Sequence, residues 1–147
     1  MALAPRRKID YANLTEFFAM NMVGERGGIV CVSSTAGEVE YKVSPTGGFL
    51  PVGMLLDDVE SLNFDRHPEY LQRNVVDVGS QVSIARKGEL ATNLVVGSPT
   101  QGQKAYLHPS GYVGATQLTD GINPAPQVGK FLTGVDAAGY VNIFVDL

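Results

Sequence analysis

The residues that could do chemistry in this chain are few, and none has the partners that a catalytic or metal site needs. His67 and His108 each precede a proline, and neither has a second histidine or a cysteine at the spacing of metal ligands. Both are explained as turn residues. The single cysteine, Cys31, excludes an internal disulfide framework. Because it lies in the apolar run of residues 29–32, we expect a small buried apolar side chain rather than a reactive thiol.

The carboxylates and glycine-rich segments do not supply a site either. Asp57 and Asp58 suggest a hydrolase or a calcium loop, but neighbouring residues on a strand point to opposite faces. The run also lacks the alternating acidic ligands and the fixed glycine of a calcium loop, so a solvated loop is the better interpretation. Residues 97–104 contain glycine and lysine without the phosphate-loop spacing or a following helical pattern. The sequence therefore predicts a protein that is not an enzyme, with no catalytic residue, no cofactor and no metal.

The charge distribution sets one short segment apart. The net charge is −4, which argues against broad nucleic-acid binding, because neutralising phosphates needs clustered cations. Arg6, Arg7 and Lys8 contribute +3, so the rest of the chain carries −7. No apolar run approaches the ~20 residues that span a bilayer, and the cationic start is not followed by the apolar region of a secretory signal. We interpret residues 1–12 as an extended arm that is either solvated or forms an interface. Three clustered cations are too few to favour RNA or DNA as its partner, and no membrane partner is predicted.

A spaced set of glycines occurs twice and indicates an internal repeat. Each member of the first set has a counterpart 74 positions later: Gly28, Gly37, Val39 and Gly47 match Gly102, Gly111, Val113 and Gly121. The match continues, with a shift of one or two positions, from residues 51–56 to residues 126–132. Glycine accepts a positive φ at turns, so repeated glycine spacing predicts one β-rich unit used twice.

The period of the apolar residues predicts an all-β fold, an antiparallel β-barrel or a β-tulip-like sandwich. Short strands are expected at 29–33, 38–43, 52–56, 81–86, 89–94, 104–107, 112–116, 128–132 and 141–145, with turn signals every 8–12 residues. The alternation places one set of side chains in the core: Val39, Tyr41, Val43, Val82, Ile84, Val141, Ile143 and Val145.

Two segments fall outside this pattern. Residues 13–22 predict a short helix, capped by Asn13, with Leu14, Phe17 and Phe18 on one face. We therefore divide the chain into an arm and short helix over residues 1–26 and a β domain over residues 27–147. Residues 59–78 have no counterpart in the second copy and are interpreted as an inserted loop, with Phe64, His67 and Tyr70 as candidate contact residues.

The order of motifs in the C-terminal half resembles a known family. Residues 81–90 form a strand with a Lys87-Gly88 turn, and a Gly102-Gln103-Lys104-Ala105-Tyr106 strand and a Gly111-Tyr112-Val113 strand follow. Val128-Gly129, an apolar strand, the acidic turn 136–139 and a terminal strand complete the order. It resembles the small capsid cement, or head decoration, proteins of tailed bacteriophages. The resemblance covers residues 79–147 strongly and 27–58 weakly.

The resemblance implies a structural virion protein made in the host cytoplasm that binds the outside of the icosahedral head. It would clamp neighbouring major capsid proteins and associate with itself, as a trimer in preference to a dimer. The capsid-contacting residues would then be Arg6, Arg7, Lys8, Tyr11, Leu14, Phe17 and Phe18. Two other assignments stay open, a tail or fibre-base component of a virion and a cellular β-barrel binding module.

Overall fold

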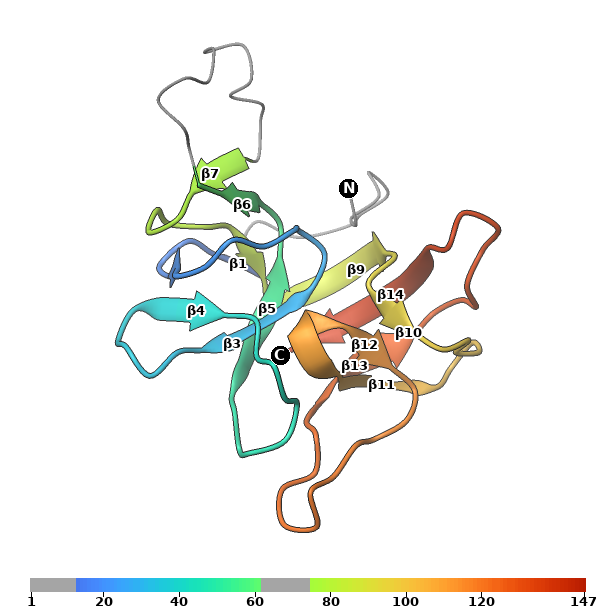
Figure 1. Cartoon of the computed structure of the whole chain (residues 1–147). Helices are drawn as coiled ribbons and strands as arrows, with labels where there is room; N and C mark the ends of the chain where they lie inside the picture. Colours follow the sequence, from blue (N-terminus) through green and yellow to red (C-terminus); the bar gives the residue numbers. More distant parts are fainter. Residues whose placement is uncertain (1–12, 62–74) are drawn as a thin grey trace.

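The computed structural model describes residues 13–61 and 75–147, and within them the fold is all-β, as predicted. Two six-stranded sheets and one two-stranded sheet make up the structure. In Figure 1 the first six-stranded sheet lies on the left and the second on the right, with the two-stranded sheet above the first. Most neighbouring strands are antiparallel, and β2–β4, β10–β12 and β6–β7 are parallel pairs.

The first sheet has the strand order β1-β8-β5-β3-β4-β2. Its strands are β1 (Leu14–Thr15), β2 (Ala19–Met20), β3 (Ile29–Val32), β4 (Glu38–Glu40), β5 (Pro51–Leu55) and β8 (Ile84–Ala85). The two-stranded sheet consists of β6 (Asp58–Glu60) and β7 (Val75–Asp77), which lie between β5 and β8 in the sequence.

The second sheet has the order β9-β14-β13-β11-β12-β10. Its strands are β9 (Lys87–Thr92), β10 (Val95–Val96), β11 (Lys104–Leu107), β12 (Val113–Gly114), β13 (Gln127–Phe131) and β14 (Val141–Asp146), and a 3-10 turn, η3 (Pro109–Gly111), precedes β12. Taken in chain order, β9 to β14 occupy the places of β1, β2, β3, β4, β5 and β8. Both the order and the direction of every pairing are the same.

The predicted repeat is therefore confirmed as two units of one topology. The β3–β5 pairing shifts register after Val30 opposite Gly53, and the β11–β13 pairing shifts at the matching place, after Ala105 opposite Gly129. The turn glycines also match, since Gly37 and Gly111 have φ values of 80° and 82°. Left-handed backbone of this kind favours glycine over residues that carry a Cβ atom, which explains the repeated spacing.

Two hydrophobic clusters lie on opposite sides of the first sheet. The inter-sheet core fills the space between the two six-stranded sheets and contains Ile29, Cys31, Met54, Leu56, Ala85, Leu90, Ala105, Leu107, Val113, Val128, Phe131, Val141, Ile143 and Val145. The outer core, on the far side of the first sheet, contains Met20, Val30, Val39, Tyr41, Leu55, Val59, Val82 and Ile84. Strand alternation produces this division, because successive side chains of β3 and β5 point to opposite faces.

The two units stack in the same orientation. Val30 faces the outer core, and its counterpart Ala105 faces the inter-sheet core. Leu55 and its counterpart Phe131 are divided in the same way. The first sheet packs against the second unit with one of its two sides. The equivalent side of the second sheet faces away from the first unit. The two-stranded sheet contributes to the outer core through Val59 of β6.

Two glycines allow neighbouring strands to approach each other closely within each sheet. A Cβ atom at Gly129 would overlap the carbonyl oxygen of Phe144 on the neighbouring strand β14. Gly53 stands in the same relation to the carbonyl oxygen of Ala85 on β8. Neither glycine has a positive φ, so the requirement at both positions is close approach rather than backbone conformation.

The ring of Tyr41 occupies a slot lined by glycines from both units. A Cβ atom would lie 2.6 Å from the ring at Gly24 and 2.7 Å from it at Gly28, and one at Gly111 of η3 would overlap it. The Tyr41 hydroxyl donates a hydrogen bond of 2.5 Å to the carbonyl of Glu25. The slot therefore attaches the η3 turn of the second unit to the first.

Two sequence predictions about this part of the chain are wrong. Residues 13–22 do not form a helix, because β1 pairs with β8 and β2 with β4, which also places them in the first sheet although they precede residue 27. Val43 is not a core residue and is 87% exposed. Tyr41 still joins Val39 in the outer core, but strand β4 ends at Glu40, and Val43 lies in the loop beyond it. The other predicted core residues are buried, as expected.

Candidate interaction surfaces

The described part of the chain brings no predicted chemical group into a metal cluster. Within residues 13–61 and 75–147, no three His, Cys, Asp or Glu residues are placed to hold a metal ion. His108 is buried beside Gly114, and its Nε2 atom lies 2.8 Å from the carbonyl oxygen of Thr116. This histidine thus anchors the strand that follows the η3 turn. His67 lies outside the described residues.

The two adjacent carboxylates are structural and not part of a solvated loop, so that interpretation is wrong. Asp57 is buried, and its Oδ2 atom accepts a hydrogen bond of 2.6 Å from the backbone N–H of Ser83. Asp58 accepts a hydrogen bond of 3.0 Å from the backbone N–H of Arg26, whose Nε atom lies 3.8 Å from the second carboxylate oxygen. A carboxylate that accepts backbone hydrogen bonds holds chain segments together, here at the point where β5 leads into β6.

Cys31 is buried in the inter-sheet core, as predicted. Burial raises the pKa of its thiol from 9.0 to about 11, because the thiolate would lose its hydration there. The thiolate is the reactive form of cysteine, so this thiol is expected to be unreactive near neutral pH.

We expect Cys31 to resist an aromatic disulfide reagent at pH 8 in the native protein, where about one thiol in a thousand would be ionised. Labelling should instead follow the unfolding transition in urea, measured from the released chromophore. Because folding raises the pKa, the stabilisation from the buried neutral thiol is fully present below pH 9 and is lost as the pH rises towards 11. Rapid labelling of the folded protein at pH 8 would contradict this expectation.

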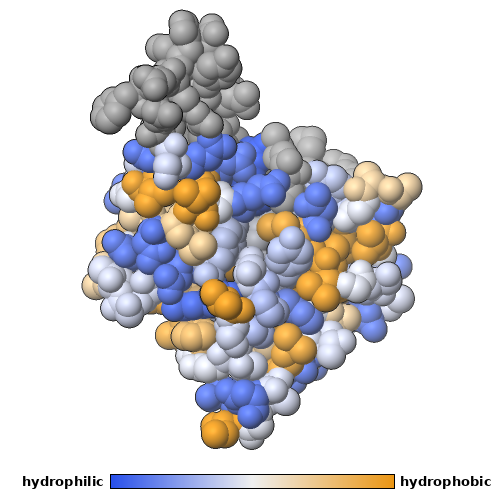
Figure 2. Space-filling view, in the orientation of Figure 1, coloured by the Kyte–Doolittle hydropathy of each residue, from blue (hydrophilic) through white to orange (hydrophobic). Residues whose placement is uncertain are grey.

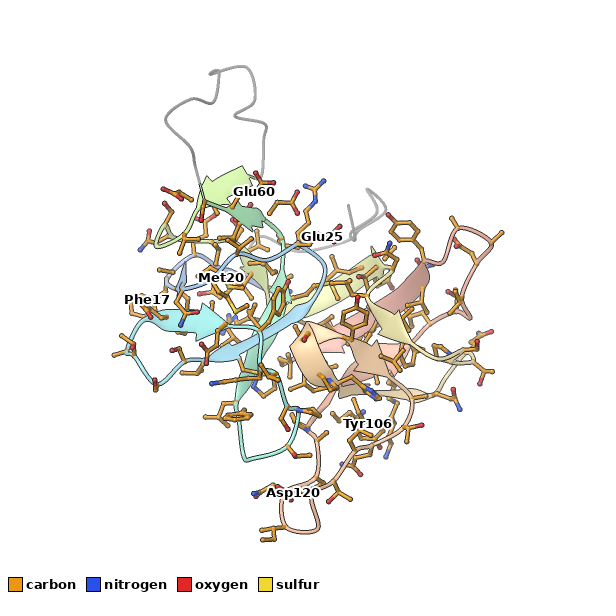
Figure 3. The ribbon with its side chains drawn as sticks, viewed as in Figure 1. Phe17, Met20, Glu25, Glu60, Tyr106 and Asp120 are labelled. Carbon is orange, nitrogen blue, oxygen red and sulfur yellow. The ribbon has the colours of Figure 1, made fainter. Side chains whose placement is uncertain are left out.

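The predicted capsid-contacting residues divide into two groups. Arg6, Arg7, Lys8, Tyr11, Phe64, His67 and Tyr70 lie outside the described residues. Leu14 packs against the inter-sheet core and Phe18 against the outer core, so both serve the fold of their own chain. Phe17 is 69% exposed and meets Phe18 edge to face, with ring centroids 5.2 Å apart. Figure 3 shows Phe17 at the margin of the first sheet, beside Met20.

Two loops present exposed apolar side chains that were not among the predicted contact residues. Val43 follows β4, and Ile122, which is 85% exposed, lies on the equivalent loop after β12. The Asp120 carboxylate accepts hydrogen bonds from the backbone N–H groups of Ile122 and Asn123, which lower its pKa and hold the tip in one shape. This loop is the lowest part of the molecule in Figure 1, and in Figure 2 hydrophobic atoms lie at its lowest point beside hydrophilic ones. An Asx turn at Asp120 was the available sequence signal.

The outward side of the second sheet carries two rows of mostly charged or polar side chains. Register pairs Lys104 of β11 with Lys130 of β13, Lys130 with Phe144 of β14, and Phe144 with Glu89 of β9. We call these four residues the first row. Their counterparts in the first sheet are Ile29, Met54, Ala85 and Leu14, which pack in or against the inter-sheet core.

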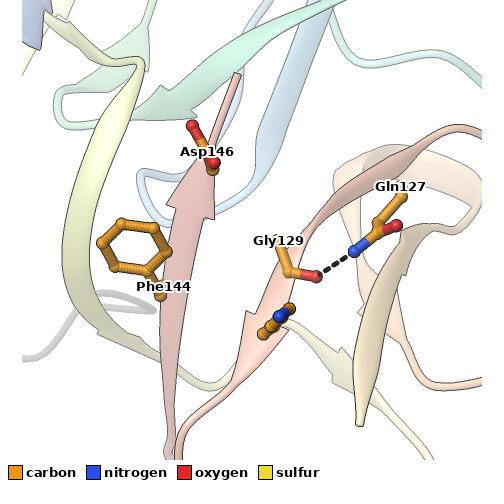
Figure 4. Close-up of a pocket in the computed structure, with 5 residues that line it drawn as sticks. Gln127, Gly129, Phe144 and Asp146 are labelled. Atoms are coloured by element: carbon orange, nitrogen blue, oxygen red, sulfur yellow. Dashed lines mark hydrogen bonds between the residues drawn. The ribbon is translucent and has the colours of Figure 1, made fainter. Parts of the chain in front are cut away.

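The second row lies beside the first on the same four strands. Tyr106 pairs with Gln127, and Asp146 pairs with Lys87, whose Nζ atom lies 3.9 Å from the Asp146 carboxylate. Gln127 and Asp146 both line an open hollow of about 380 Å³ above Gly129, together with residues of the first row. In Figure 4 the Gln127 side chain donates its hydrogen bond to the Gly129 carbonyl, at 3.2 Å. The face is thus a largely charged surface with an open hollow at its centre.

Comparison with known proteins adds no relative: no protein-family model and no curated protein sequence matches the chain. In the described part of the chain, no helix has the length and apolar character needed to cross a membrane.

Proposed function

We propose that this protein is a structural component of a tailed-phage virion that binds the outside of the head and cements neighbouring major capsid proteins. The observation that carries the proposal is the ordered set of motifs in residues 79–147. Those motifs lie largely on the strands of the second sheet, so they describe one structural unit rather than scattered turns. The role needs a stable surface, a capsid partner and no catalysis or cofactor.

Phe17 and the arm that precedes it are the proposed capsid-gripping element. Phe17 is a large exposed ring on the segment between β1 and β2, and residues 1–12, with Arg6, Arg7 and Lys8, precede β1 in the sequence. Burying one such ring contributes about 1.5–3 kcal/mol, whereas each exposed ion pair contributes about 0–1 kcal/mol. Attachment should therefore depend more on the ring than on any one cation. Self-association at a local symmetry axis of the shell completes the proposal.

Replacing Phe17 with alanine should weaken binding to heads about tenfold or more and leave folding unchanged. The ring makes few contacts within its own chain, so the unfolding free energy should move by less than about 1 kcal/mol. The measurement is co-sedimentation with DNA-filled heads prepared without this protein. Ile122→Ala is the matched control, since it removes an even more exposed apolar side chain from the second unit.

A deletion tests the arm itself. Removing residues 1–12 should weaken attachment, because it removes the three cations and keeps Phe17, and should leave a folded protein. Removing residues 1–26 would also remove β1 and β2 from the first sheet. Co-sedimentation of the full chain with detached tails instead of heads would overturn the proposal. So would normal attachment of both the Phe17→Ala and the 1–12 deletion variants.

A further inference from the structure

We propose that the outward side of the second sheet binds the same side of a second copy of this chain, across a two-fold axis that runs parallel to the strands between β13 and β14. This inference does not depend on the cement role. It is carried by the two rows of side chains on β11, β13, β14 and β9, because this rotation gives every member of both rows a complementary partner, whereas the other in-plane axis gives one only to the residues of β9 and β11.

The first row supplies an ion pair and a cation–ring contact, each made twice. Rotation about this axis places β9 of one copy over β11 of the other, and β14 over β13. Glu89 then faces Lys104 of the second copy, and Phe144 faces Lys130. Within one chain Lys104 and Lys130 are direct cross-strand neighbours of like charge, an arrangement that is unfavourable without an anion or a ring nearby. A second copy provides both, because cations bind the faces of aromatic rings.

The same rotation also gives each residue of the second row a complementary partner in the second copy. Lys87 faces Tyr106 of the second copy, and Gln127 faces Asp146, so that an amide donor meets a carboxylate acceptor. Two sheets that pack face to face lie about 10 Å apart, within reach of side chains of these lengths. The hollow above Gly129 leaves room at the centre for the ring of Phe144 or the stem of Lys130 from the other copy.

The other two-fold axis in the plane of the face is less favourable. Rotation about an axis at right angles to the strands exchanges the two rows and keeps each strand over itself. Phe144 would then face Asp146, and Lys130 would face Gln127. That arrangement leaves one lysine without an anion or a ring and places a carboxylate over an aromatic face, which carries negative charge density.

Association should be measurable at high protein concentration. The face spans four strands spaced about 4.8 Å apart, which is small for a protein interface, so we expect a weak, reversible dimer. Sedimentation equilibrium from about 10 µM to 1 mM, at low salt, should show a monomer–dimer equilibrium. A chain that stays monomeric to 1 mM, or that forms trimers, would overturn the proposal.

Charge reversal locates the contact. Lys104→Glu and Glu89→Lys should each weaken association about tenfold, since each places like charges together in both symmetric contacts. The variant with both changes should recover to within about threefold of the unmodified chain. Strands β11 and β9 are separated by β13 and β14, so the two side chains cannot pair within one chain. Recovery can therefore come only from the second copy, and a double variant as weak as the single ones would contradict the proposed axis.

Cross-linking between differently tagged chains gives an independent test. A Lys104→Cys chain mixed with a Glu89→Cys chain should be joined by a short bismaleimide cross-linker, because facing sheets about 10 Å apart are too far apart for a direct disulfide. Both sites are exposed, so neither variant should lose stability. The native Cys31 is buried and will not compete. A Lys104→Cys chain mixed with Ser98→Cys, an exposed position outside the two rows, is the control. Equal yields in both mixtures would overturn the arrangement.

Discussion

Gly129→Ala is expected to lower the unfolding free energy by about 3 kcal/mol or more, equivalent to a fall of roughly 10 °C in Tm. The new methyl group would overlap the carbonyl oxygen of Phe144, which belongs to the backbone of a central strand. Backbone within a sheet cannot give way as a flexible side chain can, so β13 and β14 would have to separate. Thermal unfolding followed by circular dichroism measures the effect.

Gly134→Ala is the matched control for this change. Gly134 also lacks a positive φ, and the nearest atom to an added Cβ would be the Pro99 carbonyl oxygen at 3.5 Å, an ordinary contact. Its cost should stay within about 0.5 kcal/mol. Because Gly53 occupies the place of Gly129 in the first unit, Gly53→Ala should be similarly damaging. A Gly129→Ala protein with the same Tm as the unmodified protein would contradict the close approach of Gly129 to the Phe144 carbonyl oxygen.

Tyr41→Ala should cost about 3–5 kcal/mol, because it empties the slot that joins the two units. Tyr41→Phe keeps the ring and removes only the hydroxyl that donates to Glu25, so its cost should be about 1–2 kcal/mol. Denaturant unfolding at neutral pH measures both. Tyr112→Ala, at an exposed tyrosine just after the η3 turn, should cost less than about 1 kcal/mol. Equal losses for Tyr41→Ala and Tyr41→Phe would assign the effect to the hydrogen bond instead of the ring.

Much of the fold could be predicted because glycine spacing reports turn geometry directly. The positions of Gly37 and Gly111 predicted two matching units before any pairing of strands was known. The alternation on β14 and around Ile84 then identified the buried faces correctly. Both signals are local, since each depends on the conformation of a few consecutive residues.

The failures arose where distant residues decide the local structure. The spacing of Leu14, Phe17 and Phe18 fits a helix, but a pattern this short fits other structures as well. Pairing of β1 with β8 overrides the local preference and sends Leu14 and Phe18 into different cores. Val43 failed for a related reason, because the alternation holds through Tyr41 and stops where β4 ends, and the glycines that receive the Tyr41 ring come from both units.

The candidate interface was only half visible in the sequence. Alternation along β11 suggests that Lys104 and Tyr106 share a face. The row that joins Lys104 to Glu89 depends on the register of four strands and on a bulge after Ala105, and neither follows from residue spacing. Leu14 is partly buried and Glu89 is exposed, although the two residues occupy equivalent places in the two units. This difference can be recognised only when the units are matched by their topology.

Packing two units in the same orientation has a consequence for filament growth. A contact between unlike sides repeats without limit, so a chain made of such units would tend to polymerise end to end. In this protein the outward side of each unit is prevented from binding a further unit, and the two sides are blocked in different ways. At one end Val59 of β6 occupies the core where another unit would dock, and at the other Lys104 and Lys130 replace the apolar Ile29 and Met54. A shortened chain would lack β6 and β7 and would carry isoleucine at position 104 and methionine at position 130. It would expose two complementary apolar surfaces, and we expect it to assemble into fibres.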